Sequence, residues 1–98
     1  MARYDVYALD GVGFVVDVQS TYLSGITTRL VMPLVQVEEV PNRNRRLNPI
    51  VEFEGDQYAL PPQQLSAVLA VDLSRPKGSL KNRADDIVTA IDVVLYGF

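Results

Sequence analysis

The spacing of apolar residues changes once along this chain of 98 residues, near position 79. Before that point, short runs of branched and aromatic residues stand between turn pairs that contain Asp, Gly or Pro, a pattern typical of β-strands. After it, apolar residues recur three and four positions apart, which is the period of one face of an α-helix. This order predicts an α+β fold with a β-rich body and one C-terminal helix, and the length fits a single domain over residues 1–98.

Two hairpins are expected in the β-rich part. Paired Asp and Gly between strand-like runs favour tight antiparallel turns. The first turn is predicted at residues 10–13, and the second is a two-residue turn at Gly55-Asp56. The strand-like runs that flank these turns are residues 4–9, 14–20, 49–54 and 57–60.

Between and after the hairpins, the pattern is less regular. Residues 29–37 predict a third strand, but Pro33 cannot donate to a ladder, so its part of the strand is expected at an edge or a bulge. Residues 21–28 are mostly small and polar and predict a loop. Residues 65–73 fit both helical and alternating spacing, and a strand is favoured because the run is short and contains β-branched residues.

The last segment carries the signals of a helix. Ser79 is the expected N-cap, and Gly97 stands where a helix ends. Asp85 and Asp86 fall near the N-terminus, where carboxylates interact favourably with the helix dipole, and adjacent residues of a helix do not converge on one ligand. The apolar stripe consists of Leu80, Ala84, Ile87, Ile91, Val94 and Phe98.

The chain contains no Cys and no His, which excludes disulfide scaffolds, zinc ribbons, thiol catalysis and imidazole bases. Nothing assembles a nucleophile, a base and an orienting group, so we expect no catalytic residue, metal or cofactor. The formal net charge of −3 argues against general attraction to nucleic acid or to anionic membranes. No apolar run is long enough to span a membrane and no signal peptide is seen, so the cytoplasm is the expected compartment.

Three arginines form the main cationic cluster, at positions 43, 45 and 46. Such a cluster can grip phosphates, but the rest of the chain supplies neither a positive field nor a stacking platform. We therefore interpret Arg43, Arg45 and Arg46 as part of a solvated loop.

Bulky side chains stand at two places where no strand is expected to bury them. The chain ends in Tyr96-Gly97-Phe98, with no polar tail. Phe98 could complete the core stripe, or the two rings could project as anchors for a partner while Gly97 permits close approach. Tyr22 and Leu23, in the early loop, could likewise fold back onto the core or contribute to an interface.

Three segments match the pattern of one known family in order and spacing. They are Val16-Asp17-Val18-Gln19-Ser20, Arg29-Leu30-Val31-Met32-Pro33-Leu34, and the ending from Ala84 to Phe98. Together they resemble the CcdB family of toxins from bacterial toxin–antitoxin modules, over the whole chain. The resemblance implies an SH3-like barrel of the CcdB/PemK-like kind, with an antiparallel sheet and one C-terminal helix, that forms a homodimer.

The resemblance also implies a toxin that is not an enzyme. Family members poison DNA gyrase: they enter the dimerisation region of the A subunit while the enzyme holds cleaved DNA, and they block resealing. A CcdA-like antitoxin neutralises the toxin, and their complex represses its own operon, so the toxin meets DNA only through that complex. The positions that match the family's gyrase-binding residues are Tyr22, Leu23, Asp92, Tyr96, Gly97 and Phe98.

Two departures from the family pattern keep alternatives open. The well-known member ends in Trp-Gly-Ile, and it carries an amide where this chain has Asp92. One alternative is therefore a CcdB-like toxin with a different or lost target. Another is an mRNA endoribonuclease of the MazF/Kid type, which shares the barrel but needs a positive groove and a proton-transfer group.

Overall fold

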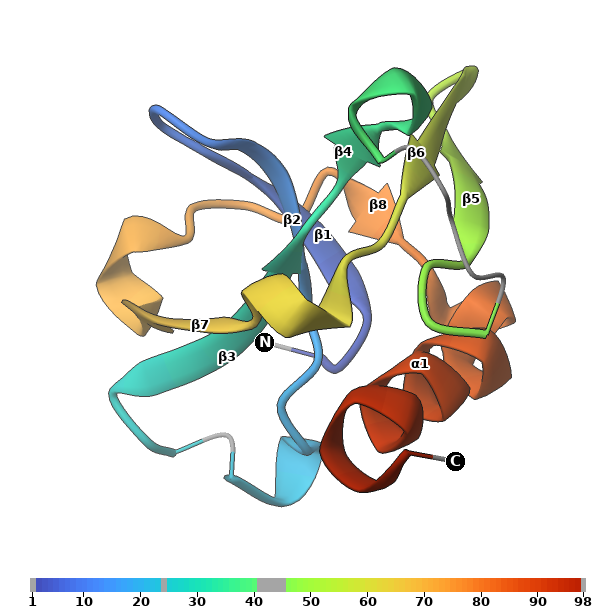
Figure 1. Ribbon diagram of the computed structural model, residues 1–98. Coiled ribbons are helices and arrows are strands. Elements are labelled where there is room, and N and C mark those ends of the chain that lie inside the picture. The colour runs from blue at the N-terminus through green and yellow to red at the C-terminus, as the bar shows by residue number, and fades with distance from the viewer. Residues whose placement is uncertain (1, 24, 41–45, 98) are drawn as a thin grey trace.

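The computed structural model describes residues 2–23, 25–40 and 46–97. Within these ranges the chain forms two antiparallel sheets and one α-helix, α1 (Ala84–Tyr96), as predicted for an α+β fold (Figure 1). The strand order is β7-β3-β2-β1-β8 in the first sheet and β4-β6-β5 in the second. The strands are β1 (Asp5–Leu9), β2 (Gly13–Asp17), β3 (Thr28–Pro33), β4 (Val35–Gln36), β5 (Ile50–Phe53), β6 (Asp56–Ala59), β7 (Ser66–Leu69) and β8 (Gly78–Ser79).

Both predicted hairpins form, but both turns differ by one residue: Gly13, predicted in the first turn, already pairs with Leu9 as the first residue of β2, and the second turn is shifted by one position. Phe53 pairs with Asp56, so the turn consists of Glu54 and Gly55 and not of Gly55-Asp56. Both turn residues have positive φ, +52° for Glu54 and +83° for Gly55. A type I′ turn requires positive φ at both central positions and matches the right-handed twist of the flanking strands. Asp56 is therefore the first residue of β6.

The predicted strand over residues 29–37 is wrong in its length, because it breaks at Leu34. β3 ends at Pro33, whereas β4 belongs to the second sheet. Pro33 lies opposite Val15 of β2, and on its other side β7 reaches only as far as Val31. Its missing N–H therefore falls where no neighbour pairs, as expected for an edge position.

Two other predicted segments, the loop 21–28 and the strand 65–73, each contain a short 3₁₀ turn. The loop predicted at residues 21–28 contains the turn η1 (Thr21–Leu23) before β3 begins. The run 65–73 is a strand over β7, as favoured, but it ends in the 3₁₀ turn η4 (Ala70–Asp72). The β-strand prediction is therefore wrong for residues 70–72, which turn the chain away from β3.

The main core lies between the first sheet, the second sheet and α1. Side chains alternate along a strand, and the register places Val6, Val16 and Met32 on the same face of the first sheet. We call this the helix-facing side, because Ile87 of α1 packs against it. The buried residues of this core are Val6, Val16, Val18, Met32, Leu34, Val51, Phe53, Tyr58, Leu60, Leu80 and Ile87.

The opposite face of the first sheet, called here the far side, carries a smaller core. Tyr7, Val15 and Val31 lie on this face, and Leu73 covers them from the segment after η4. Both faces of the central strands are thus buried, which explains the nearly continuous apolar sequence of β2 and β3.

The helix begins later than predicted. The Ser79 hydroxyl accepts a hydrogen bond from the N–H of Lys81 at 3.1 Å, but the 3₁₀ turn η5 (Lys81–Arg83) intervenes and α1 starts at Ala84. Ser79 is therefore not the N-cap of α1. The predicted end is confirmed: Gly97 adopts φ +82°, and its N–H donates to the Val93 carbonyl at 2.9 Å.

Candidate functional site

The C-terminal turn of α1 presents large side chains to solvent. Tyr96 is 67% exposed and Leu95 is also exposed, whereas Ile87 and Ala90, two turns earlier, are fully buried. Asp92 is half-buried and precedes Tyr96 by four positions, so the two residues share one face of the helix. The helix is thus anchored at its middle and carries an exposed aromatic residue at its end.

Gly97 stops the helix directly after Tyr96. Its φ of +82° is unfavourable for residues with a Cβ, and an added Cβ would meet no atom within 4 Å. Backbone conformation, and not packing within the subunit, is therefore the reason for glycine here. Phe98, the remaining member of the predicted C-terminal set, lies outside the described residues.

The turn η1 holds the second pair of predicted site residues. Local hydrogen bonds close this turn: the N–H of Leu23 donates to the Ser20 carbonyl at 2.9 Å, and the N–H of Tyr22 donates to the Ser20 hydroxyl at 3.2 Å. Tyr22 is 93% exposed and Leu23 is also exposed. The structure therefore excludes, for Tyr22, the alternative in which the loop side chain folds back onto the core.

Figure 1 shows η1, in light blue, and the C-terminal end of α1, in dark red, toward the same edge of the molecule. The predicted residues Tyr22, Leu23, Asp92, Tyr96 and Gly97 thus come from two segments, far apart in sequence, at one edge. We call these five residues the aromatic edge. Most of its side-chain area faces solvent, which suits contact with another macromolecule better than enclosure of a small ligand.

A buried ion pair lies beneath the loop that carries Tyr22. Arg29 donates from Nε and Nη2 to Oδ2 of Asp17, at 2.8 and 2.7 Å, and both side chains are fully buried. This pair joins the end of β2 to the beginning of β3 on the far side of the sheet. The connection between β2 and β3, residues 18–27, contains η1, so the pair fixes the base of the loop.

Gln19 links the ion pair to η1. Its N–H donates to Oδ1 of Asp17 at 3.0 Å, and its carbonyl accepts from Nη2 of Arg29 at 3.4 Å. Its side chain donates to the Leu23 carbonyl at 3.2 Å and accepts from the Leu30 N–H at 3.0 Å. One glutamine therefore ties the exposed turn both to the buried pair and to β3.

Sequence reasoning missed this polar support of the aromatic edge. Asp17 and Gln19 were used only as part of a family pattern, although a carboxylate inside the apolar run Val15–Val18 is itself a signal of a buried partner. The alternation of β2 places Asp17 on the same face as Val15, which is buried. A buried carboxylate requires a cation or donors, and the first cation after it is Arg29.

Tyr7 belongs to the same buried face. Burial raises the pKa of its hydroxyl, and the neighbouring carboxylates of Asp5 and Asp17 raise that pKa further, while Arg29 opposes them. Within the described residues, the Tyr7 hydroxyl and Nη1 of Arg29 are buried without a hydrogen-bond partner. The hydroxyl therefore stays protonated at neutral pH.

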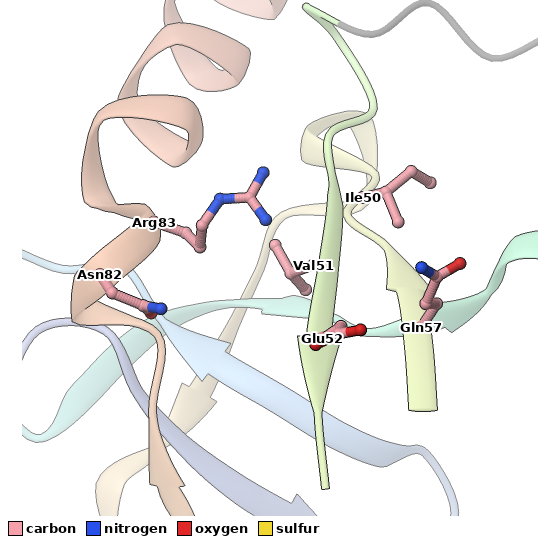
Figure 2. Close-up of a pocket in the computed structure, with 6 residues that line it drawn as sticks. All are labelled: Ile50, Val51, Glu52, Gln57, Asn82 and Arg83. Carbon is pink, nitrogen blue, oxygen red and sulfur yellow. The ribbon is translucent and has the colours of Figure 1, made fainter. Parts of the chain in front are cut away.

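A pocket lies near the N-terminal end of α1, away from Tyr96 (Figure 2). It has a volume of about 270 Å³ and lies between β5, β6 and η5. Among the described residues that line it, Arg83 is the cation, and it pairs with Asp86 through Nε and Nη2, both at 2.8 Å. The residues that line it are Ile50, Val51, Glu52, Gln57, Asn82 and Arg83, a set without a nucleophile and general base in contact.

The remaining candidate groups give no further site. Arg43 and Arg45 lie outside the described residues, whereas Arg46 is described and exposed. In the described part of the chain, no three acidic side chains gather in a way that could hold a metal ion. Nor does any helix there have the length and apolar character needed to cross a membrane.

Comparison with known proteins places this geometry in context. The chain matches no curated protein. Two similar solved structures are an endoribonuclease from Mycobacterial species, and an endoribonuclease in complex with its cognate antitoxin from Mycobacterial species. Both structures are 14% identical to this chain, and each match covers 97% of it. The first match covers 90% of the endoribonuclease chain with a TM-score of 0.77. The second covers 94% of the chain from the antitoxin complex with a TM-score of 0.76.

At this identity, the two structures show a shared fold and nothing about chemistry. The sequence itself carries the family assignment, because the model of the CcdB protein family matches residues 3–97. The match includes β1 through α1 and both segments of the aromatic edge. The chain therefore belongs to the CcdB family.

Proposed function

We propose that this chain is the toxin of a type II toxin–antitoxin module and that it poisons DNA gyrase through the aromatic edge. In this proposal, the edge enters the dimerisation region of the A subunit while DNA is cleaved, and it prevents resealing without any catalysis by the toxin. The observation that carries the proposal is the exposure of Tyr22 and Tyr96 on two ordered segments at one edge of the fold.

Each residue of the edge has a role that its chemistry suits. The rings of Tyr22 and Tyr96 offer flat faces over which an arginine of the target can stack, a contact worth roughly 1–2 kcal/mol when it is desolvated. Gly97 ends α1 without a side chain, so the target backbone can approach closely. Phe98 would follow as a second terminal anchor, and Leu23 adds apolar area next to Tyr22. The half-buried carboxylate of Asp92 favours a basic target surface, in keeping with the net charge of −3.

The partners follow from the toxin role. A CcdA-like antitoxin would neutralise the protein by covering the surface that gyrase needs, which removes active toxin by mass action. Operon DNA would be bound only by the toxin–antitoxin complex. A homodimer would present two aromatic edges to the two-fold symmetric A subunit pair. One of the structurally similar endoribonucleases is itself in complex with its cognate antitoxin, which supports the toxin–antitoxin setting.

A second candidate is cleavage of mRNA, because both similar structures are endoribonucleases. The residues described here favour it less. Arg29 is fully buried in its ion pair with Asp17 and is not available for a phosphate, and Arg83 already pairs with Asp86. The aromatic edge also carries no group suited to proton transfer at neutral pH except the carboxylate of Asp92.

The two functions are separated by one experiment. Purified protein is mixed with gyrase, ATP and supercoiled plasmid, and linear DNA trapped after detergent is measured; labelled RNA is incubated in parallel. We expect trapped cleavage complexes with the full chain and none after deletion of residues 96–98. A deletion variant that unfolds would assign those residues to the core, so its far-UV spectrum and urea midpoint are measured alongside. RNA cleavage without trapped DNA would refute the gyrase proposal.

A further inference from the structure

A second group of cations, besides that at positions 43–46, lies in residues 75–83. This segment contains four of the nine lysines and arginines of the chain and no carboxylate, although the formal net charge of the chain is −3. Arg75, Lys77 and Lys81 are exposed, and we call these three residues the basic strip. Like charges held close together repel one another, and a partner of opposite charge relieves that repulsion.

Buried residues on either side anchor the basic strip. Leu73 packs into the smaller core on the far side before the strip begins, and Leu80 packs into the main core near its end. Between these anchors β8 pairs with β1, and the N–H of Lys77 donates to the Val6 carbonyl at 2.6 Å. The backbone beneath the cations is therefore ordered before a partner arrives, which lowers the entropy that binding costs.

Within the described residues, no ion pair neutralises the basic strip. The ion pairs found there are the two given above, and neither includes a member of the strip. Asp5 lies opposite Ser79 in the register of β1 with β8, but its carboxylate accepts a hydrogen bond from the N–H of Ala2 at 3.3 Å. The three cations are thus available to carboxylates of another molecule.

The basic strip follows an open edge of the first sheet. β8 is the last strand on that side, and no described strand pairs with its outer edge. Figure 1 shows this segment, in orange, running from η4 past β8 to the start of α1. β8 consists of Gly78 and Ser79 alone, so its backbone can pair with only a short stretch of a partner. Charge must therefore supply most of the recognition.

The two ends of the basic strip favour a short acidic peptide over a nucleic acid. Asp72 precedes the strip, Asp85 and Asp86 follow it, and all three side chains are exposed. A long phosphate backbone would meet these carboxylates at both ends, whereas a short acidic segment fits between them. Residues 72–86 also contain no aromatic side chain on which a base could stack.

We infer that the basic strip docks an extended, acidic segment of a partner protein along the β8 edge. Carboxylates of this segment pair with the guanidinium group of Arg75 and with the ammonium groups of Lys77 and Lys81, while its backbone lies beside β8. The strip shares no residue with the aromatic edge. The inference therefore goes beyond the proposed function and does not depend on gyrase as the target.

Two double variants matched in net charge test the inference. Arg75→Gln with Lys77→Gln removes two positive charges from the basic strip. Thr27→Glu with Gln64→Glu changes the net charge by the same amount at exposed positions next to β7, the opposite edge of the sheet. The probe is a labelled peptide of about ten residues in which Glu and Thr alternate, which in extended form matches the length of residues 75–83. Fluorescence anisotropy measures its dissociation constant, and far-UV spectra report folding.

We expect the strip variant to raise the dissociation constant of the peptide about 3–10-fold and the control variant to raise it less than about two-fold, because exposed ion pairs are individually weak. Raising the salt concentration from about 50 to 300 mM should also weaken binding to the unmodified chain.

Three outcomes would overturn the inference. Equal losses in the strip variant and in the control variant would show that only net charge matters. No binding by the unmodified chain at low salt, together with aggregation of the strip variant, would assign the cations to protection of a sheet edge. A single-stranded oligonucleotide that displaces the peptide and binds more tightly would assign the strip to nucleic acid.

Amide chemical shifts of the unmodified chain locate the peptide without any variant. Addition of the peptide should shift the N–H resonances of residues 77–81 and leave those of η1 and of the last turn of α1 unchanged. Shifts confined to the aromatic edge would refute the β8 location. The strip variant should trap gyrase as the unmodified chain does, so peptide docking and gyrase poisoning succeed or fail separately.

Discussion

The ion pair between Asp17 and Arg29 allows a sharp test of what stabilises this fold. Asp17→Asn keeps the shape of the side chain but removes its charge. Oδ2 of Asp17 receives two donors of Arg29, at 2.8 and 2.7 Å, and neither side chain reaches solvent. The variant would leave a buried guanidinium without its counter-charge, a change that costs about 3–5 kcal/mol.

That cost is large for a chain of this size. Total stabilities of about 5–15 kcal/mol are usual, so a loss of about 3–5 kcal/mol would remove roughly a fifth of the stability or more. With a urea dependence of about 1–1.5 kcal/mol per molar, the unfolding midpoint should fall by at least about 2 M. Urea titration followed by far-UV circular dichroism measures this shift directly.

The chain contains its own control for this reasoning. Asp86 accepts from the same two donor atoms of Arg83, both at 2.8 Å, but this pair is partly exposed to solvent. Asp86→Asn should therefore cost less than about 1 kcal/mol. The double variant Asp17→Leu with Arg29→Met removes both buried charges and should recover most of the stability lost by Asp17→Asn. Equal, small losses for Asp17→Asn and Asp86→Asn would refute the argument from burial.

Three further predictions concern packing, pH and the aromatic edge. Gly78→Ala should cost about 1–3 kcal/mol in thermal unfolding, because its Cβ would stand 2.6 Å from the ring of Phe53; Gly25→Ala, which meets nothing within 4 Å, should change little. The pKa of the Tyr7 hydroxyl is raised in the folded protein, so the unfolded chain loses the hydroxyl proton at a lower pH than the folded chain does. The free energy of unfolding should therefore decline as the pH rises above the ordinary tyrosine pKa of 10. Tyr7→Phe should reduce that decline, which urea titrations at pH 9 and 11 measure. Asp92→Asn should raise the protein concentration needed to trap gyrase, because the variant loses the carboxylate that attracts a basic target surface; an unchanged concentration would remove Asp92 from the contact.

Local sequence signals predicted the order of elements in this fold well. The helix could be predicted because apolar residues at spacings of three and four are typical of one face of a helix. Its end could be predicted because glycine readily adopts the positive φ that ends a helix, as Gly97 does. The hairpins were recognised from Asp and Gly pairs. The turn at Glu54 was missed because glutamate seldom adopts positive φ, and only the pairing of Phe53 with Asp56 enforces it.

Errors arose where tertiary packing overrides local pattern. The run 29–37 reads as one strand, but the chain crosses from one sheet to the other at Leu34, which is buried in the main core. The start of α1 shifted because Leu80 turns into the core before the helix begins, so η5 must connect them. Neither the break at Leu34 nor the later start of α1 can be predicted from composition or from the spacing of apolar residues.

The aromatic edge was predictable in its members but not in its support. Exposed bulky residues in a loop and at a terminus are visible in the sequence, whereas the partnership of Asp17 with Arg29 depends on the register between β2 and β3. Gln19 could not be recognised at all from residue type, since its role follows from reaching both Leu23 and Leu30.

Different sets of contacts hold the two halves of the aromatic edge in place. Tyr96 depends on α1, whose middle is anchored in the main core and whose end is set by Gly97. Tyr22 depends on the polar contacts of Gln19 and on the buried ion pair on the far side of the sheet. Because the two supports consist of different residues, we expect Tyr22→Ala to leave α1 intact and truncation after residue 95 to leave η1 intact. Losses in gyrase trapping from the two changes should therefore combine additively in free energy if one target surface contacts both. A double variant no weaker than the worse single variant would show that only one of the two segments reaches the target.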